Sequence, residues 1–87
     1  MIRNLWIDHP IILSKYLKGN SIDIYEEWYD LVNTMLTELE MTDPDCRVHQ
    51  IKVKFGKLRV YAEMSVDKIS IVNNILTRYE EQSLLLR

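Results

Sequence analysis

The sequence predicts a small α+β domain in which one antiparallel hairpin packs on helices. Residues 46–64 alternate apolar and polar side chains around a Gly-Lys pair, which is typical of a hairpin. Residues 23–40 and 65–82 instead repeat apolar side chains at helical spacing. The 87 residues are enough for a single domain. We divide it into an N-terminal segment over 1–20 and a helix-hairpin-helix unit over 21–87.

The first predicted element is a short helix from Pro10 to Lys18. Proline is favoured in the first turn of a helix and glycine just after its end, and Gly19 follows here. Asp8 or His9 is then expected to cap its N-terminus. The side chains expected to face the core are Ile12, Leu13, Tyr16 and Leu17.

The second predicted helix runs from about Asp23 to Glu40. Asp23 and Glu26 have the spacing of a capping box, with aspartate in place of serine or threonine. Pro44 then ends the element, because the residue before a proline disfavours the helical region. The apolar side chains at helical spacing are Trp28, Leu31, Val32, Met35, Leu36 and Leu39.

The predicted hairpin turns at Gly56-Lys57, since glycine at the first position of a two-residue loop fits a type II′ turn. The turn fixes the register of the two strands. On the face expected to meet the core, the predicted pairs are Phe55 with Leu58, Val53 with Val60, and Ile51 with Ala62. On the outer face they are Lys54 with Arg59, Lys52 with Tyr61, and Gln50 with Glu63.

The last predicted helix begins after Ser65, which is expected to cap it, and ends near Gln82. Met64 and Ile69 occupy the two positions of a hydrophobic staple. A two-stranded sheet is marginal alone, so we expect the helices to cover its apolar face. The predicted buried stripe of this helix is Ile69, Val72, Ile75, Leu76 and Tyr79.

Charge is segregated along the chain. No Lys or Arg occurs between Gly19 and Cys46, and this stretch holds eight of the 13 acidic residues. The hairpin has no acidic residue between Cys46 and Leu58. A basic face of this kind can be solvated, pair with the acidic helix, or bind an anionic partner. Like charges directly opposite each other destabilise a hairpin, and this favours some neutralising partner.

The basic outer face is therefore our first candidate for partner binding, and the acidic helix is the second. Carboxylates of that helix could instead neutralise the basic face internally. The first-choice residues are Lys52, Lys54, Lys57, Arg59 and Tyr61. The second-choice residues are Glu26, Glu27 and Asp30.

We expect no metal, no cofactor and no catalytic residue. Cys46-x-x-His49 has the spacing of half a zinc site, but residues three apart on a strand point to opposite faces, so the pair could chelate only if residue 46 lay in the preceding loop. Cys46 with His49 or His9 is the one conceivable nucleophile and base, and nothing else favours it. A single cysteine and no apolar run of about 20 residues are typical of a cytoplasmic protein without a membrane span.

The hairpin segment from Gln50 to Tyr61 reads Q-I-K-V-K-F-G-K-L-R-V-Y. It resembles the motif Q-V-K-E-K-F-G-G-L-R-F-Y of a family of small, mostly uncharacterised phage and bacterial proteins. The resemblance covers roughly residues 26–83. It departs from the motif at Val53 and Lys57, and the C-x-x-C of many relatives is missing, so no zinc role carries over. The resemblance implies a phage origin and a partner-binding role, with no activity to transfer.

These observations together predict a non-enzymatic phage-type protein that occupies a host macromolecule. A host protein is the expected partner, and the protein would inhibit a host defence or regulatory component in the host cytosol. Nucleic acid is less favoured, because the formal charge is -2 and the pI about 5.6. The alternatives are a binder that sequesters a small anionic nucleotide and a structural or assembly protein. Because the outer edges of the hairpin are expected to be unpaired, a homodimer is a further alternative to a monomer.

Overall fold

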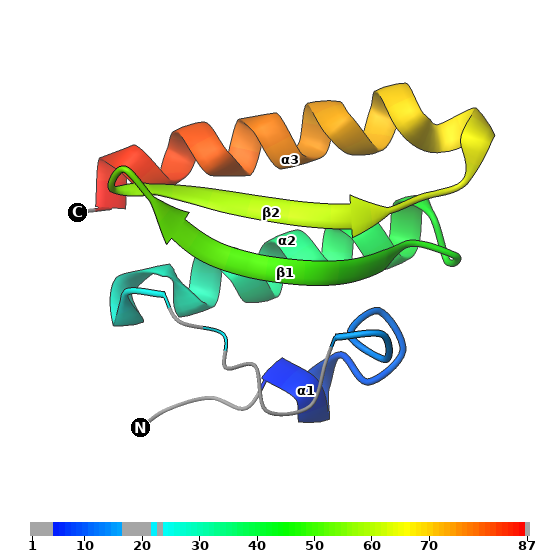
Figure 1. The fold of residues 1–87 in the computed structure, drawn as a ribbon, viewed down its shortest axis with the longest axis horizontal. Coiled ribbons are helices and arrows are strands. Elements are labelled where there is room, and N and C mark those ends of the chain that lie inside the picture. Colours follow the sequence, from blue (N-terminus) through cyan, green and yellow to red (C-terminus); the bar gives the residue numbers. More distant parts are fainter. Residues whose placement is uncertain (1–4, 17–21, 23, 87) are drawn as a thin grey trace.

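The computed structural model describes residues 5–16, 22 and 24–86, and the predicted α+β class is confirmed. The hairpin lies in front of α2, α3 runs alongside β2, and the N-terminal segment lies on the β1 side (Figure 1). In chain order the elements are α1 (Leu5–Asp8), the 3-10 turn η1 (Glu26–Trp28), α2 (Tyr29–Thr42), β1 (Arg47–Lys54), β2 (Lys57–Glu63), η2 (Val66–Lys68), α3 (Ile69–Ser83) and η3 (Leu84–Leu86).

The predicted helix from Pro10 to Lys18 is wrong over its described part. Residues 10–16 form turns, and the short α1 precedes them. The physical reason is that the Ile12 carbonyl accepts the Val48 N–H of β1 at 2.9 Å. A helix would direct that carbonyl to Tyr16 N–H, which instead binds Leu13 O at 3.0 Å. Leu17, Lys18 and Gly19 lie outside the described residues.

The second helix forms where the pattern predicts, with shifted ends. Its first turn is η1, which begins at Glu26 without a side-chain cap, and Asp23 lies outside the described residues. It ends at Thr42, because Asp43 is already extended ahead of Pro44. The buried stripe is confirmed for Trp28, Val32, Met35, Leu36 and Leu39, whereas Leu31 is half-buried.

The hairpin is confirmed, but the predicted turn and register are wrong. Phe55 and Gly56 form the two-residue turn, with φ of 54° and 75°, the left-handed values of a type I′ turn. Lys54 therefore pairs with Lys57, and all the predicted pairs shift by two residues. This even shift keeps the paired side chains on their predicted faces, but it moves Phe55 from the core face into the turn, where it is 96% exposed. The register is irregular between Val48 and Gln50. The observed core pairs are Val53 with Leu58, Ile51 with Val60, and Val48 with Ala62.

The last helix is confirmed, but two predictions about its start are wrong. The Ser65 hydroxyl does not cap η2 or α3, because it donates to Asp43 Oδ1 at 2.8 Å. Ile69 is 46% exposed, so it is not part of the buried stripe. The remaining predicted stripe is buried, and Glu80 and Ser83 are buried with it.

Side chains close both edges of the hairpin, which the sequence pattern predicts to be unpaired. Ser83 Oγ accepts Leu58 N–H at 3.1 Å, and Glu80 Oε2 accepts Val60 N–H at 3.1 Å. On the other edge, the Tyr16 hydroxyl accepts Ile51 N–H at 3.0 Å. Together with the Ile12–Val48 bond, these contacts occupy the backbone groups that strand addition would use at these positions.

Candidate functional site

The five first-choice residues lie together on the outer face of the hairpin. We call Lys52, Lys54, Lys57, Arg59 and Tyr61 the basic hairpin face. The register places Lys52 opposite Arg59 and Lys54 opposite Lys57, while Tyr61 faces Gln50. The predicted Lys54–Arg59 pair is therefore replaced by two pairs of like charges. Lys52 and Tyr61 are diagonal neighbours, and the ammonium lies 5.4 Å from the centre of the ring.

The charges of this face are only partly neutralised. Arg59 Nη1 lies 3.6 Å from Glu80 Oε1. Within the described part of the chain, no carboxylate forms an ion pair with Lys52, Lys54 or Lys57. Like charges at directly paired positions repel each other, so this face destabilises the isolated fold by some tenths of a kcal/mol.

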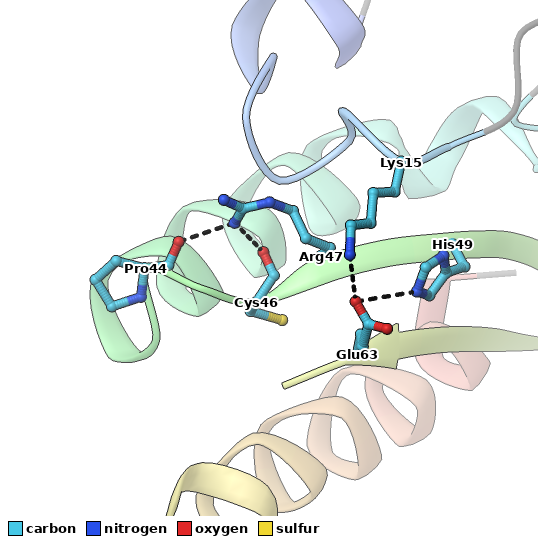
Figure 2. A network of polar contacts seen from close by, with 6 residues as sticks. All are labelled: Lys15, Pro44, Cys46, Arg47, His49 and Glu63. Atoms are coloured by element: carbon cyan, nitrogen blue, oxygen red, sulfur yellow. Dashed lines mark hydrogen bonds and ion pairs between the residues drawn. The ribbon is translucent and has the colours of Figure 1, made fainter. Parts of the chain in front are cut away.

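At the opposite end of the hairpin, the charged side chains form hydrogen bonds and ion pairs with neighbouring groups (Figure 2). Arg47 donates through Nη1 to the carbonyls of Pro44, at 2.9 Å, and Cys46, at 2.8 Å. Glu63 accepts from Lys15 Nζ at 2.8 Å and lies 3.8 Å from His49 Nε2. The hydrogen bond from Lys15, and then its charge, hold the pKa of Glu63 below its usual range.

Among the described residues, the ion pairs with the basic hairpin face do not include the second-choice acidic residues. Glu26, Glu27 and Asp30 are exposed at the start of the second helix. The ion pair to this face comes instead from Glu80 on α3. The sequence pattern gives no signal for Glu80, because its carboxylate meets the hairpin only once α3 packs alongside β2.

Three other acidic residues of the segment between Gly19 and Cys46 have structural partners. Glu38 binds Arg78 and accepts the Tyr79 hydroxyl at 2.7 Å. His9 lies between Glu40 and Asn33, so the idea that it caps a helix is wrong. The third residue, Asp43, is bound by Ser65 and Asp45.

Asp43 joins the end of α2 to the segment after β2. Its carboxylate accepts the Ser65 N–H and hydroxyl, both at 2.8 Å, and the Asp45 N–H at 3.1 Å. Burial acts to raise the pKa of Asp43, but these hydrogen bonds and the nearby charge of Lys68 outweigh it and lower the pKa. Part of the acidic stretch is therefore structural.

Cys46 lies in the loop just before β1, the one position from which it could chelate together with His49, but the two side chains have different surroundings. Cys46 is 1% exposed in the core, whereas the His49 side chain is 41% exposed. Burial, and then the negative charge of Asp43, raise the pKa of the Cys46 thiol to about 11. The thiol is thus protonated at neutral pH and is a poor nucleophile. Among the residues that the structure describes, no three His, Cys, Asp or Glu side chains are placed to hold a metal ion.

Two features beside the basic hairpin face were not predicted. An open hollow of about 320 Å³ is lined by Ile24, Tyr25, Lys52 and Val53. The turn residue Phe55, predicted to pack in the core, projects from the tip. The hollow has no local sequence signal, since its walls come from two segments. Phe55 could have been found by asking whether the turn lies one residue earlier.

Two further findings concern membrane spans and similarity to known proteins. Over residues 5–16, 22 and 24–86, every helix is too short or too polar to cross a membrane. No protein-family model, no curated protein and no solved structure matches this chain.

Proposed function

We propose that the chain is a non-enzymatic binding protein whose basic hairpin face contacts an acidic surface on a partner protein. The observation that carries the proposal is the like-charge pairing across the strands, above all Lys54 with Lys57, because in the second pair, Lys52 with Arg59, Glu80 partly neutralises Arg59. Opposite potentials on two surfaces steer encounter and select partners. A carboxylate-bearing partner would remove the repulsion, so part of the binding energy is already present as strain in the free protein.

A protein partner is favoured over nucleic acid by the overall charge. The chain carries a formal charge of -2, and the exposed carboxylates of Glu26 and Glu27 would repel a long polyanion that extends past the hairpin. An acidic patch on a protein can be as small as the basic hairpin face. The resemblance of the hairpin sequence to the phage family extends the proposal to a host protein, and to inhibition of a host defence or regulatory component.

The hollow next to Lys52 favours one alternative. Its walls combine aromatic and apolar side chains with a cation, which is the chemistry that holds a small anionic nucleotide. That function predicts that added nucleotides raise the melting temperature of the protein. The partner-protein proposal predicts no such effect.

The test uses two double variants with the same change in net charge. Lys54→Glu/Lys57→Glu reverses two cations of the basic hairpin face that have no ion pair among the described residues. Lys15→Glu/Arg78→Glu reverses two cations that lie off this face and are ion-paired with Glu63 and Glu38. Each tagged protein is used to capture proteins from nuclease-treated lysate of its native cell, and the retained proteins are quantified by mass spectrometry.

The proposal expects one stoichiometric protein retained by the wild type and by the off-face variant, and lost with the Lys54/Lys57 variant. Equal retention by both double variants would contradict it, because the basic hairpin face would then not be the contact. Circular dichroism spectra of all three proteins establish that each is folded.

A further inference from the structure

Phe55 is placed against two ordinary preferences at once. Its side chain is 96% exposed, although phenylalanine gains by burial. Its φ of 54° lies in the left-handed region, which is unfavourable for a bulky residue. Asparagine, aspartate or glycine is the usual occupant of this position in a type I′ turn. In the free protein, this side chain therefore contributes neither apolar burial nor a favourable backbone conformation.

The surroundings of Phe55 indicate what would cover it. Lys54 and Lys57 flank the turn as a like-charged pair. The end of α3 lies beside the turn, because Ser83 Oγ accepts Leu58 N–H at 3.1 Å (Figure 1). The three leucines that follow Ser83 are also exposed, Leu84 by 50%, Leu85 by 83% and Leu86 by 44%. An apolar tip with cations beside it complements an apolar pocket with carboxylates beside it.

We propose that Phe55 is the anchor of the interface, inserted into an apolar pocket that is bordered by Asp or Glu side chains on the partner protein. This inference rests on the proposed function and adds the chemistry of the contact. Buried aromatic anchors supply a large share of the binding energy of many protein interfaces. Exposure and a left-handed backbone are then costs in the free protein that the bound state offsets.

The inference predicts opposite effects on stability and binding from one substitution. Phe55→Asn creates the Asn-Gly dipeptide that type I′ turns prefer, so the melting temperature should rise by roughly 4–8 °C. Affinity for the captured partner, measured by isothermal titration calorimetry, should fall at least about 30-fold, as for a hot-spot residue. The matched control is Met41→Gln, which removes another exposed apolar side chain, 82% exposed and on α2. It should leave the affinity unchanged.

A photo-crosslinker tests the chemistry of the pocket. Benzoylphenylalanine is placed at position 55, and at position 41 as the control, and the crosslinked partner peptide is sequenced. The inference expects an adduct only from position 55, in a peptide whose apolar surface residues have Asp or Glu neighbours. A crosslink to a second copy of this chain would overturn it. So would binding to phosphatidylserine vesicles that Phe55→Asn abolishes, because the occupant would then be a lipid surface.

The two proposals fail in different ways. If Lys54→Glu/Lys57→Glu abolishes binding and Phe55→Asn does not, the basic hairpin face remains the contact and the anchor is wrong. If Phe55→Asn lowers the melting temperature, the side chain stabilises the free fold and the inference is also wrong. A higher melting temperature together with lost affinity supports it.

Discussion

The two ends of the hairpin handle charge in opposite ways. At the base end, around Arg47 and Glu63, the charges bind neighbouring groups, among them Lys15 of the N-terminal segment. At the tip end, Lys54 faces Lys57, and neither has an ion pair with a described carboxylate. The strand pairing is regular from Gln50 to the tip, whereas it is irregular between Val48 and Gln50 near the base end.

The difference follows from what packs on each end. Residues 10–16 run past β1 and make contacts there at Val48 and Ile51, which brings Lys15 to the base end. Beside the tip lies the end of α3, which presents a hydroxyl and is followed by leucines. The base end is therefore held by contacts within the chain, whereas the tip end retains exposed charge and an exposed apolar side chain.

The largest expected effect on stability comes from a substitution at the base end of the hairpin. Asp43→Ala removes the acceptor of two backbone N–H groups and of the Ser65 hydroxyl, and leaves the donors without it. We expect a loss of about 2–4 kcal/mol in the free energy of unfolding, measured in urea. Glu81→Ala, exposed on α3, is the control and should change little. A loss equal to that of the control would show that Asp43 does not hold this end.

A smaller effect is expected from acid. Because the pKa of Asp43 is lower in the folded than in the unfolded state, its stabilisation is complete above the unfolded pKa, about 3.9. The stabilisation is lost as the pH falls through the folded pKa. The difference in free energy of unfolding between wild type and Asp43→Asn should therefore shrink below about pH 4. A difference that stays constant down to the acid limit would contradict the role of the carboxylate.

The smallest expected effect sharpens the comparison at the tip. Lys57→Glu turns the like-charged pair with Lys54 into an opposite-charged pair. The isolated protein should gain about 0.3–1 kcal/mol in urea unfolding, with a smaller gain at high salt. Lys57→Gln should give about half of this gain, because it removes repulsion without adding attraction. A destabilised Lys57→Glu protein would mean that the tip lysines do not repel each other.

Most of the fold could be predicted, because the spacing of apolar residues along the chain indicates its main helices and strands. Each periodic pattern defines one apolar face that packs against the core. Examples are the stripe from Trp28 to Leu39 and the alternation around Val53 and Val60. The turn was misplaced by one residue because Gly56 suits either position of the loop. The pattern at Pro10 predicted a helix, since it does not reveal that the Ile12 carbonyl binds a strand.

The candidate face was predicted in composition, but its pairing was not. Any even shift of register leaves Lys52, Lys54, Lys57, Arg59 and Tyr61 on one face, so the prediction that they share a face did not depend on the correct register. Which cations oppose each other depends on the turn. The neutralisation of Arg59 by Glu80 depends on the packing of α3 against β2.

The sequence alone determined which segments form helices and strands, which side chains share a face, and where charge accumulates. These depend on spacing along the chain, which is local. The tertiary structure decided the register, the closing of both hairpin edges by Tyr16, Glu80 and Ser83, and the projection of Phe55 from the tip. The edge contacts depend on groups far apart in sequence that only folding brings together, and the register and the place of Phe55 depend on which of two turns the packed hairpin adopts.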